Sequence, residues 1–287
     1  MGTEDYVPYL QIASKLALQP GDWIMVSADI SRLAFMAKRR EGDFQAQKFI
    51  KSLYEAVQPG GTIIIPAYNY LLQDGDTFDL KNTRPVTGTL AVEALKMNGF
   101  KRTKHPLHSF AVMGKGQDEL CKLNNTGSFD EDSPFAIMYQ RKAKALIIGL
   151  DLHSTFTFTH YVEEMANVAY RYKKKFTLNY IDGQGTAVKK QFSMFSKYPW
   201  IGLNFNPLEK MLVPADLQQS NINGCSFRII DLAKAYHIIY KEIKENKAKN
   251  ITYFDLKRGF KELSKNLLRK LGLYKTLTEK VHNATDL

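Results

Sequence analysis

Cysteine is scarce in this sequence: only Cys121 and Cys225 occur, far apart and outside any CxxC pattern. A disulfide framework or a zinc site built on these two residues is therefore not expected. The sequence also has no unbroken apolar run long enough to cross a membrane. Its N-terminus carries acidic residues and lacks the basic segment of a secretory signal. These absences predict a cytoplasmic protein.

The sequence carries an excess of positive charge. The chain has 287 residues, 44% of them hydrophobic and 24% charged, and a net charge of +11. This composition is typical of a soluble globular protein with one large α/β domain or two smaller ones. A strongly basic chain favours nucleic acid, an anionic membrane surface or an anionic small molecule such as a nucleotide as its partner.

Roughly half of the positive excess lies beyond residue 240. Lysines there alternate with apolar residues at helical spacing, namely Leu256, Phe260, Leu263, Leu267 and Leu271. This spacing predicts a main domain over residues 1–245 and a basic helical extension over 246–287 that packs on it through the apolar stripe. No recognition motif accompanies the charge, so neither a nucleic-acid partner nor stable membrane insertion is expected.

Short apolar runs alternate with amphipathic stretches. WIMVSA (23–28), GTIIIPA (61–67), HSFAVMG (108–114) and KALIIGL (144–150) read as strands, and residues 43–57, 87–99 and 132–142 read as helices. Such alternation predicts an α/β fold with a mixed, mostly parallel central sheet flanked by helices. Two alternating runs flank Asp182-Gly183, which predicts a small antiparallel β insertion. C-terminal helices follow it.

The stretch TFTFTHYVEE, residues 155–164, follows the strand expected at 144–150. If a helix begins near Thr157, then Thr157, His160 and Glu163 lie broadly along one face, where Glu163 can fix the imidazole tautomer of His160. Such a pair is more often an ordinary surface pair than a catalytic dyad. A metal site would combine His105, His108, His153 and His160, but their spacing follows no metal signature, so no metal is expected.

Six segments occur in a fixed order: VSADIS, PGGTIIIPAYNY, RPVTGTLAVEAL, RTKHPLHSFAVMGKG, DEDSPF and LIIGLDLHSTFTFTHYVEEMANV. Together they resemble the aminoglycoside 3-N-acetyltransferase family, also called the antibiotic N-acetyltransferases, over roughly residues 20–175. The resemblance implies an α/β fold distinct from the GNAT acetyltransferases, with acetyl-CoA as donor and a primary amine on a sugar ring as acceptor. Residues 1–245 would then be the acetyltransferase domain.

The resemblance also implies roles for particular residues. His160 falls on the family's general base, and Glu163 or Asp29 would steady its imidazolium. Because no cysteine lies in a matched motif, direct transfer is favoured over a covalent acetyl-enzyme. The candidates for donor contacts are Ser27, Ser31, Arg102, His105, Ser109 and Phe110, with backbone N–H groups near Ser31 or Ser109 as oxyanion donors. Those for acceptor contacts are Tyr68, Thr157, Tyr161 and Trp200.

Two departures from the family pattern bear on the acceptor. The chain reads Val26-Ser27-Ala28-Asp29 where antibiotic-modifying members read V-H-S-S, and its loop over 149–157 is about one residue longer. FTFTHYVEE is similar to members associated with bacterial surface-polysaccharide synthesis. A nucleotide-linked sugar and coenzyme A both carry a pyrophosphate, and two anionic ligands suit a basic protein. The favoured acceptor is therefore a nucleotide-linked amino-dideoxy sugar with its amine at C3 or C4.

Two other functions stay open. An aminoglycoside acceptor would need an acidic pocket, and the candidates are Asp74, Asp76, Asp79, Asp130, Glu131 and Asp132. A relative without catalysis would bind nucleic acid or an anionic membrane through the basic C-terminal helix. The sequence leaves the oligomeric state open between a monomer and a homodimer.

Overall fold

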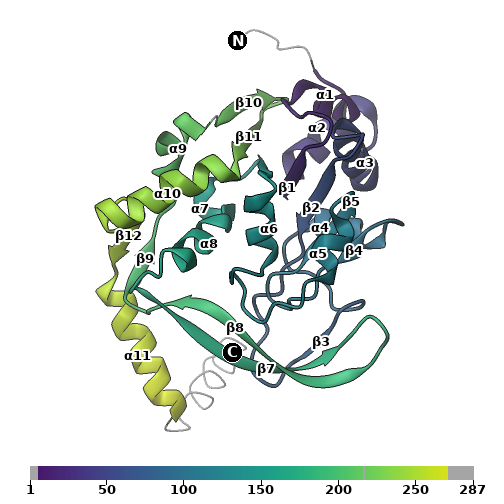
Figure 1. Ribbon diagram of the computed structural model, residues 1–287. Helices are drawn as coiled ribbons and strands as arrows, with labels where there is room; N and C mark the ends of the chain where they lie inside the picture. The colour runs from purple at the N-terminus through teal and green to yellow at the C-terminus, as the bar shows by residue number, and fades with distance from the viewer. Residues whose placement is uncertain (1–5, 216, 271–287) are drawn as a thin grey trace, which may run out of the picture.

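The computed structural model describes residues 6–215 and 217–270 (Figure 1). Its centre is a seven-stranded sheet. The strand order is β10 (Gln218–Ile222), β11 (Cys225–Asp231), β6 (Lys144–Ile148), β1 (Trp23–Ala28), β2 (Thr62–Pro66), β5 (Phe110–Gly114) and β4 (Lys101–Arg102). Each of the four strands expected from the sequence is present at its expected place, which confirms the α/β fold.

The three middle strands β6, β1 and β2 are parallel and buried on both faces. Their side chains alternate between two cores, because successive residues of a strand point to opposite faces. Met25 and Ile64 enter one core, whereas Ile24 and Ile63 enter the other. This arrangement explains why the three strands read as continuous apolar runs in the sequence.

Helices cover both faces of the sheet (Figure 1). One core is closed by α5 (Gln117–Lys122), α6 (Pro134–Gln140), α8 (Phe158–Met165) and α10 (Leu232–Asn246). The other is closed by η1 (Tyr9–Gln11), α1 (Ile12–Lys15), α2 (Ser31–Glu41), α3 (Ala46–Ala56) and α4 (Thr89–Lys96). The start of α6 is fixed locally, since the Ser133 hydroxyl accepts a hydrogen bond from the Ala136 N–H and Pro134 occupies the first turn.

The prediction of a mostly parallel sheet is wrong. Only the β1–β2 and β1–β6 pairs are parallel, while the other four neighbouring pairs are antiparallel. The reason is the path of the chain: short β4 forms an antiparallel pair with β5 at one edge, and β10 and β11 form another at the opposite edge. Antiparallel pairing at both edges leaves parallel strands only in the middle.

A second sheet contains β3 (Thr77–Asp79), β7 (Arg171–Ile181) and β8 (Ala187–Lys197). The long β7–β8 pair is antiparallel and turns at Asp182-Gly183, as the sequence predicts. Strand β3 adds to β7 in parallel, which no sequence pattern indicates. The β7–β8 ribbon runs along one side of the molecule, and β7 begins directly beyond α8 (Figure 1).

The end of the described chain differs from the expected packing. Strand β12 (Thr252–Phe254) pairs with β9 (Ile201–Leu203), and α11 (Leu256–Lys270) follows. The apolar stripe is exposed over the described part of α11, since Phe260 is 70% and Leu267 60% accessible, whereas Leu271 and the rest of the predicted extension, 271–287, lie outside the described residues. Between β9 and β10 lie α9 (Leu208–Met211) and η2 (Val213–Ala215). In the described ranges, no helix is long and apolar enough to cross a membrane.

Arg102 ties together the loops that leave β2 and enter β5. Its guanidinium donates hydrogen bonds to the Ser109 hydroxyl at 2.9 Å, to the carbonyl of Ala67 at 2.9 Å and to Asn69 Oδ1 at 2.6 Å. It also bonds the Thr83 carbonyl. Arg102 is buried, and Ser109 is wholly buried beside it. Since these donors are engaged inside the protein, the expected contacts of Arg102 and Ser109 with the acetyl donor do not fit the structure.

We predict that Arg102→Ala lowers the free energy of unfolding by roughly 3 kcal/mol, because it leaves several buried acceptors unpaired. Arg84→Ala, in the same loop region, is the matched control and should change stability little. Urea denaturation and titration with acetyl-CoA would measure both effects. Weakened acetyl-CoA binding with unchanged stability would contradict the structural role and restore Arg102 as a contact of the acetyl donor.

Candidate active site

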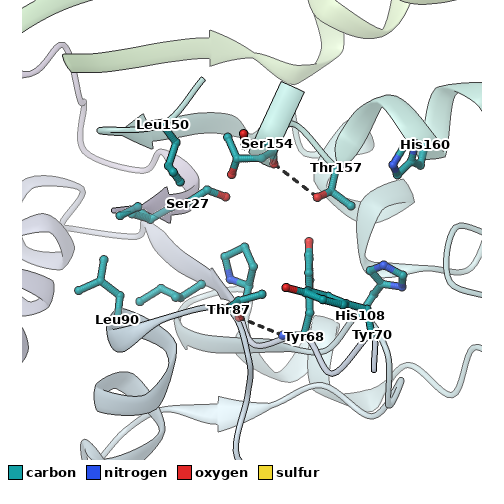
Figure 2. A pocket seen from close by; sticks show the side chains of 15 residues that line it. Ser27, Tyr68, Tyr70, Thr87, Leu90, His108, Leu150, Ser154, Thr157 and His160 are labelled. Atoms are coloured by element: carbon teal, nitrogen blue, oxygen red, sulfur yellow. Dashed lines mark hydrogen bonds between the residues drawn. The ribbon is translucent and has the colours of Figure 1, made fainter. Parts of the chain in front are cut away.

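A cavity of about 360 Å³ opens at the carboxyl ends of β1, β2 and β6. The chain adds β2 on one side of β1 and β6 on the other, and ligands of open α/β sheets bind at such a reversal of strand order. Figure 2 shows Thr157 and His160 on one wall and Tyr68 and His108 on the other. Ser27, Tyr70, Thr87, Leu90, Leu150 and Ser154 complete the labelled lining.

The loop after β6 brings His160 to this cavity. Gly149 has φ of 67°, and a Cβ there would lie 2.5 Å from the carbonyl oxygen of Asp29, so only glycine fits. Asp151 then caps the short helix α7 (Leu152–Thr155) by accepting a hydrogen bond from the Ser154 N–H at 2.7 Å. Buried Phe158 and Val162 fix α8 against the core, which sets the direction of His160.

His160 and Glu163 form a hydrogen-bonded pair. The imidazole Nδ1 lies 2.7 Å from Glu163 Oε2, and 23% of the His160 side chain is exposed whereas Glu163 is fully buried. The Tyr170 hydroxyl donates to the other oxygen, Oε1, at 2.9 Å. An Nδ1–H bond to the carboxylate leaves the lone pair of Nε2 free, which is the state a general base requires.

Arg171, the first residue of β7, completes the network. Its Nε lies 2.8 Å from Glu163 Oε2, and its Nη2 lies 2.8 Å from His160 Nδ1. Its Nη1 donates to the carbonyl of Phe195 on β8 at 2.9 Å, which fixes the guanidinium. A guanidinium only donates, so Nδ1 either accepts from Arg171 or, as N–H, donates to Glu163, and only the second form leaves Nε2 free to act as a base.

The charges of this network set its protonation. Burial lowers the pKa of His160, the charge of Arg171 lowers it further, and Glu163 offsets part of the shift, so that the pKa lies below its usual value. Burial alone would raise the pKa of Glu163, but the charge of Arg171 and the hydrogen bonds from His160 and Tyr170 hold it below its usual range. At neutral pH the pair is therefore a neutral imidazole beside a carboxylate.

Aromatic rings hold the imidazole in place. Phe129 approaches it edge-on, with 5.6 Å between ring centroids, and Phe205 lies at 5.4 Å. Phe129 also contacts the His108 ring at 4.8 Å, so one aromatic side chain packs between the two histidines. This packing restricts rotation of His160 and keeps its partners at hydrogen-bond distance.

Tyr68 presents an unpartnered hydroxyl at the cavity. The residue is only 5% exposed, and its oxygen has no hydrogen-bond partner in the described part of the chain. Burial raises its pKa, and the neighbouring Thr157 hydroxyl offsets little of that shift, so Tyr68 stays a neutral donor. Its ring is held edge-on to His108 and Phe110 at 4.9 and 5.4 Å. A buried donor without a partner is a candidate for a ligand contact.

The cavity wall carries hydroxyls and imidazoles but no carboxylate or ammonium side chain among the described residues. A second hollow of about 770 Å³ lies beyond Arg171, on its other side. Its acidic lining comprises Asp130, Glu131, Asp132 and Glu164. Lys173 bridges Asp130 at 2.6 Å and Glu164 at 2.8 Å, and burial raises the pKa of Glu164 to about 7.

Several sequence candidates meet at this site. Ser27, Tyr68, Thr157 and His160 line the cavity, and Glu163 supports His160 from behind. Asp29 instead accepts a hydrogen bond from the Ser31 N–H at 2.9 Å at the start of α2, and no described contact joins it to His160. Glu163, therefore, is the carboxylate placed to orient the histidine.

The remaining candidates lie elsewhere. His105 and Phe110 are fully buried, and Tyr161 packs against Tyr139 and Tyr236 in the core. Trp200 stacks on Tyr198, with 5.0 Å between centroids, and does not line the cavity. Direct ligand contacts do not fit the buried positions of His105, Phe110 and Tyr161, whereas Trp200 is only partly buried and its acceptor contact stays a prediction.

Arg171 and Tyr170 are site residues that no sequence pattern marks. They lie in the segment YRYKKK, where a basic run reads as a solvated strand edge. The one available signal in the sequence is their closeness to Glu163. Tyr170 follows it by seven residues and Arg171 by eight, so the intervening turn is short. In the described residues, no group of three or more His, Cys, Asp or Glu side chains is arranged to hold a metal ion.

Comparisons with known proteins agree with this fold. A relative from Salmonella, aminoglycoside N(3)-acetyltransferase IV, is 30% identical over 125 residues, which span 42% of this chain and 46% of that protein. The structure of AAC-IIIb with CoASH superposes with a TM-score of 0.71 at 20% identity, covering 84% of this chain and 98% of that one. Sisomicin-bound AAC-VIa superposes with a TM-score of 0.70 at 18% identity, covering 84% and 99%.

The aligned part thus spans less than half of the Salmonella relative, and the solved structures share the fold. A sequence profile of the aminoglycoside 3-N-acetyltransferases matches residues 25–244, which include every residue of the His160 network. The chain belongs to the aminoglycoside 3-N-acetyltransferase family.

Proposed function

We propose that this protein transfers an acetyl group from acetyl-CoA to a primary amine on a sugar ring, with His160 as the general base. The observation that carries the proposal is the Nδ1 contact with Glu163 at 2.7 Å, which leaves Nε2 free in a histidine that lines the cavity. The structure of AAC-IIIb, which shares this fold, is a binary complex with CoASH, which supports coenzyme A as the carrier of the acetyl group.

In this mechanism the free amine attacks the thioester carbonyl, and His160 Nε2 takes the proton that the nitrogen loses. A C–N bond forms, the C–S bond breaks, and the thiolate of coenzyme A leaves and takes up a proton. The low pKa of His160 keeps the imidazole unprotonated at neutral pH, and Glu163 stabilises the imidazolium that forms. Neither Cys121 nor Cys225 lines the cavity, which supports direct transfer.

The developing oxyanion needs a fixed donor. The Ser31 N–H is bonded to Asp29, and the Ser109 hydroxyl donates to the Ala67 carbonyl at 2.6 Å, so neither is free for that task. We assign the task to the Tyr68 hydroxyl, because it is buried, unpartnered and opposite His160. Figure 2 shows the tyrosine rings on the wall that faces Thr157.

Two acceptors are supported by different observations. The names of the relatives favour an aminoglycoside, and Asp130, Glu131, Asp132 and Glu164 provide an acidic lining beside the catalytic network that suits a polycation. Asp74, Asp76 and Asp79 bond backbone N–H groups around β3 instead. An aminoglycoside is thus the leading acceptor.

A nucleotide-linked amino-dideoxy sugar, acetylated at a C3 or C4 amine, is the second candidate. Two features support it: the net charge of +11 and a cavity wall that carries hydroxyls without any carboxylate. Hydroxyl side chains suit the hydroxyls of an uncharged sugar ring, while a basic surface attracts the pyrophosphate.

Release of coenzyme A, followed by thiol detection, tests the proposal with acetyl-CoA and two sets of acceptors. One set holds several aminoglycosides, and the other holds TDP-, UDP- and GDP-linked amino sugars. Turnover with one aminoglycoside would support the leading acceptor, and turnover with one nucleotide sugar the second. Acetyl-CoA binding without release from any amine would contradict the proposed function.

We predict that His160→Asn lowers kcat by roughly 100-fold or more, because the general base is lost, while acetyl-CoA affinity stays nearly unchanged. Steady-state kinetics and calorimetric titration would measure the two effects. His237→Asn, an exposed histidine on α10, is the matched control. Unchanged turnover in the His160 variant would exclude this residue as the base.

Replacing Arg171 by Gln should move the acid limb of kcat/KM to higher pH. The charge of Arg171 lowers the pKa of His160, so its removal raises that pKa and protonates the base over a wider pH range. Arg171→Lys keeps a charge and should show a smaller shift, and thermal unfolding of both variants reports any loss of structure. An acid limb that does not move in a folded Gln variant would contradict this role.

Tyr68→Phe removes a single hydroxyl and should lower kcat by roughly 10- to 100-fold with little change in KM. Tyr70→Phe is the matched control, since Tyr70 lines the same cavity but is 53% exposed. Stopped-flow or steady-state rates at saturating acetyl-CoA would measure the loss. An equal loss in both variants, or an effect on KM alone, would argue against Tyr68 as the oxyanion donor.

A further inference from the structure

The end of the described chain exposes a run of large apolar side chains. Phe254 on β12 is 76% exposed, and on α11 Leu256 is 64%, Phe260 70%, Leu263 51% and Leu267 60% exposed. Leaving this much apolar surface in water is unfavourable, and contiguous exposed apolar patches mark interaction surfaces. We call these five residues the α11 stripe.

The stripe lies on one narrow side of α11. Leu256, Phe260, Leu263 and Leu267 follow the i, i+4, i+7, i+11 spacing, which places them within an arc of roughly 60°. The helix meets the body through Gly259, where a Cβ would lie 2.9 Å from Trp200 Cβ. The stripe therefore lies beside the contact of Gly259 with Trp200, and it is not part of the core. Figure 1 shows α11 in yellow, extending from the β9–β12 corner.

The same helix is strongly basic. Its fifteen residues include six Lys or Arg and one Glu, a net charge of +5. Lys257, Arg258 and Lys261 are exposed, and by helical spacing they lie on the sides away from the stripe. An exposed apolar stripe combined with a basic polar face is the make-up of helices that lie in the plane of a membrane surface.

We propose that α11, together with Phe254, docks on an anionic lipid surface. The stripe enters the boundary between headgroups and acyl chains, while the basic face contacts lipid phosphates. Nucleic acid would satisfy the charges but leave the stripe uncovered. A second copy would cover the stripe but bring two helices of charge +5 together. An anionic bilayer covers the apolar stripe and binds the basic face at once. The protein then lies on the membrane surface and does not span it.

Co-sedimentation with vesicles tests the proposal on the full chain. With phosphatidylcholine vesicles that contain 30% phosphatidylglycerol, we expect binding that is lost with pure phosphatidylcholine and weakened by salt. Phe260→Glu/Leu263→Glu should reduce binding by roughly tenfold or more, because it puts charge into the stripe. Lys257→Gln/Lys261→Gln should reduce it severalfold through the loss of two cations.

Each variant has a matched control. Phe35→Glu changes an exposed apolar residue on α2, and Lys174→Gln/Lys175→Gln removes two exposed charges from β7. Both should bind vesicles like the parent protein, and thermal unfolding should be alike in all four variants. Equal loss of binding in the controls would overturn the proposal, because net charge alone would then explain it.

Three other results would also overturn it. The stripe would be assigned to a second copy if the protein did not bind anionic vesicles and light scattering showed a dimer that Phe260→Glu/Leu263→Glu dissociates. Absence of binding in the full chain, with binding gained when residues 271–287 are removed, would assign the stripe to that segment. Preferred binding of a DNA duplex that survives Phe260→Glu/Leu263→Glu would assign the helix to nucleic acid.

Discussion

The buried ion pair between Arg171 and Glu163 is the interaction on which the site depends. Glu163 has no exposed surface, and a carboxylate placed there without a cation would be strongly unfavourable. Arg171 stabilises that charge and is itself held by the carbonyl of Phe195. The pair therefore joins α8 to the β7–β8 ribbon, and it fixes His160 at the same time. Removal of either partner would affect both the packing and the protonation of the histidine.

The His160–Glu163–Arg171 network borders two hollows of different character. His160 faces the cavity at the ends of β1, β2 and β6, whose walls are uncharged. Arg171 also borders the hollow lined by Asp130, Asp132 and Glu164, where the charges are mostly negative. A neutral wall suits a thioester arm or a sugar ring, whereas an acidic one suits a polycation.

Much of the fold can be predicted from the sequence, because β1, β2 and β6 are buried on both faces and read as apolar runs. The pairing of His160 with Glu163 follows from helical spacing in the same way. Burial is harder to predict: Arg102, His105 and Ser109 lie in a polar, basic segment, yet they are enclosed by loops that come from distant parts of the chain. Arg171 lies only eight residues beyond Glu163, but the basic segment around it reads as a solvated strand edge, so the sequence does not mark it as a partner of the carboxylate. The apolar stripe of α11 was predicted correctly as a helix face, but its exposure is a property of the tertiary structure.

The most direct test of this account needs no acceptor. NMR titration of the protein labelled with ¹⁵N-histidine, with His160→Asn used for assignment, reports both the tautomer and the pKa of His160. We expect a proton on Nδ1, a free Nε2, and a pKa of His160 below the usual value of about 6.5. A proton on Nε2 at neutral pH, or a pKa at or above the usual value, would contradict the claim that Glu163 and Arg171 hold His160 as a neutral base.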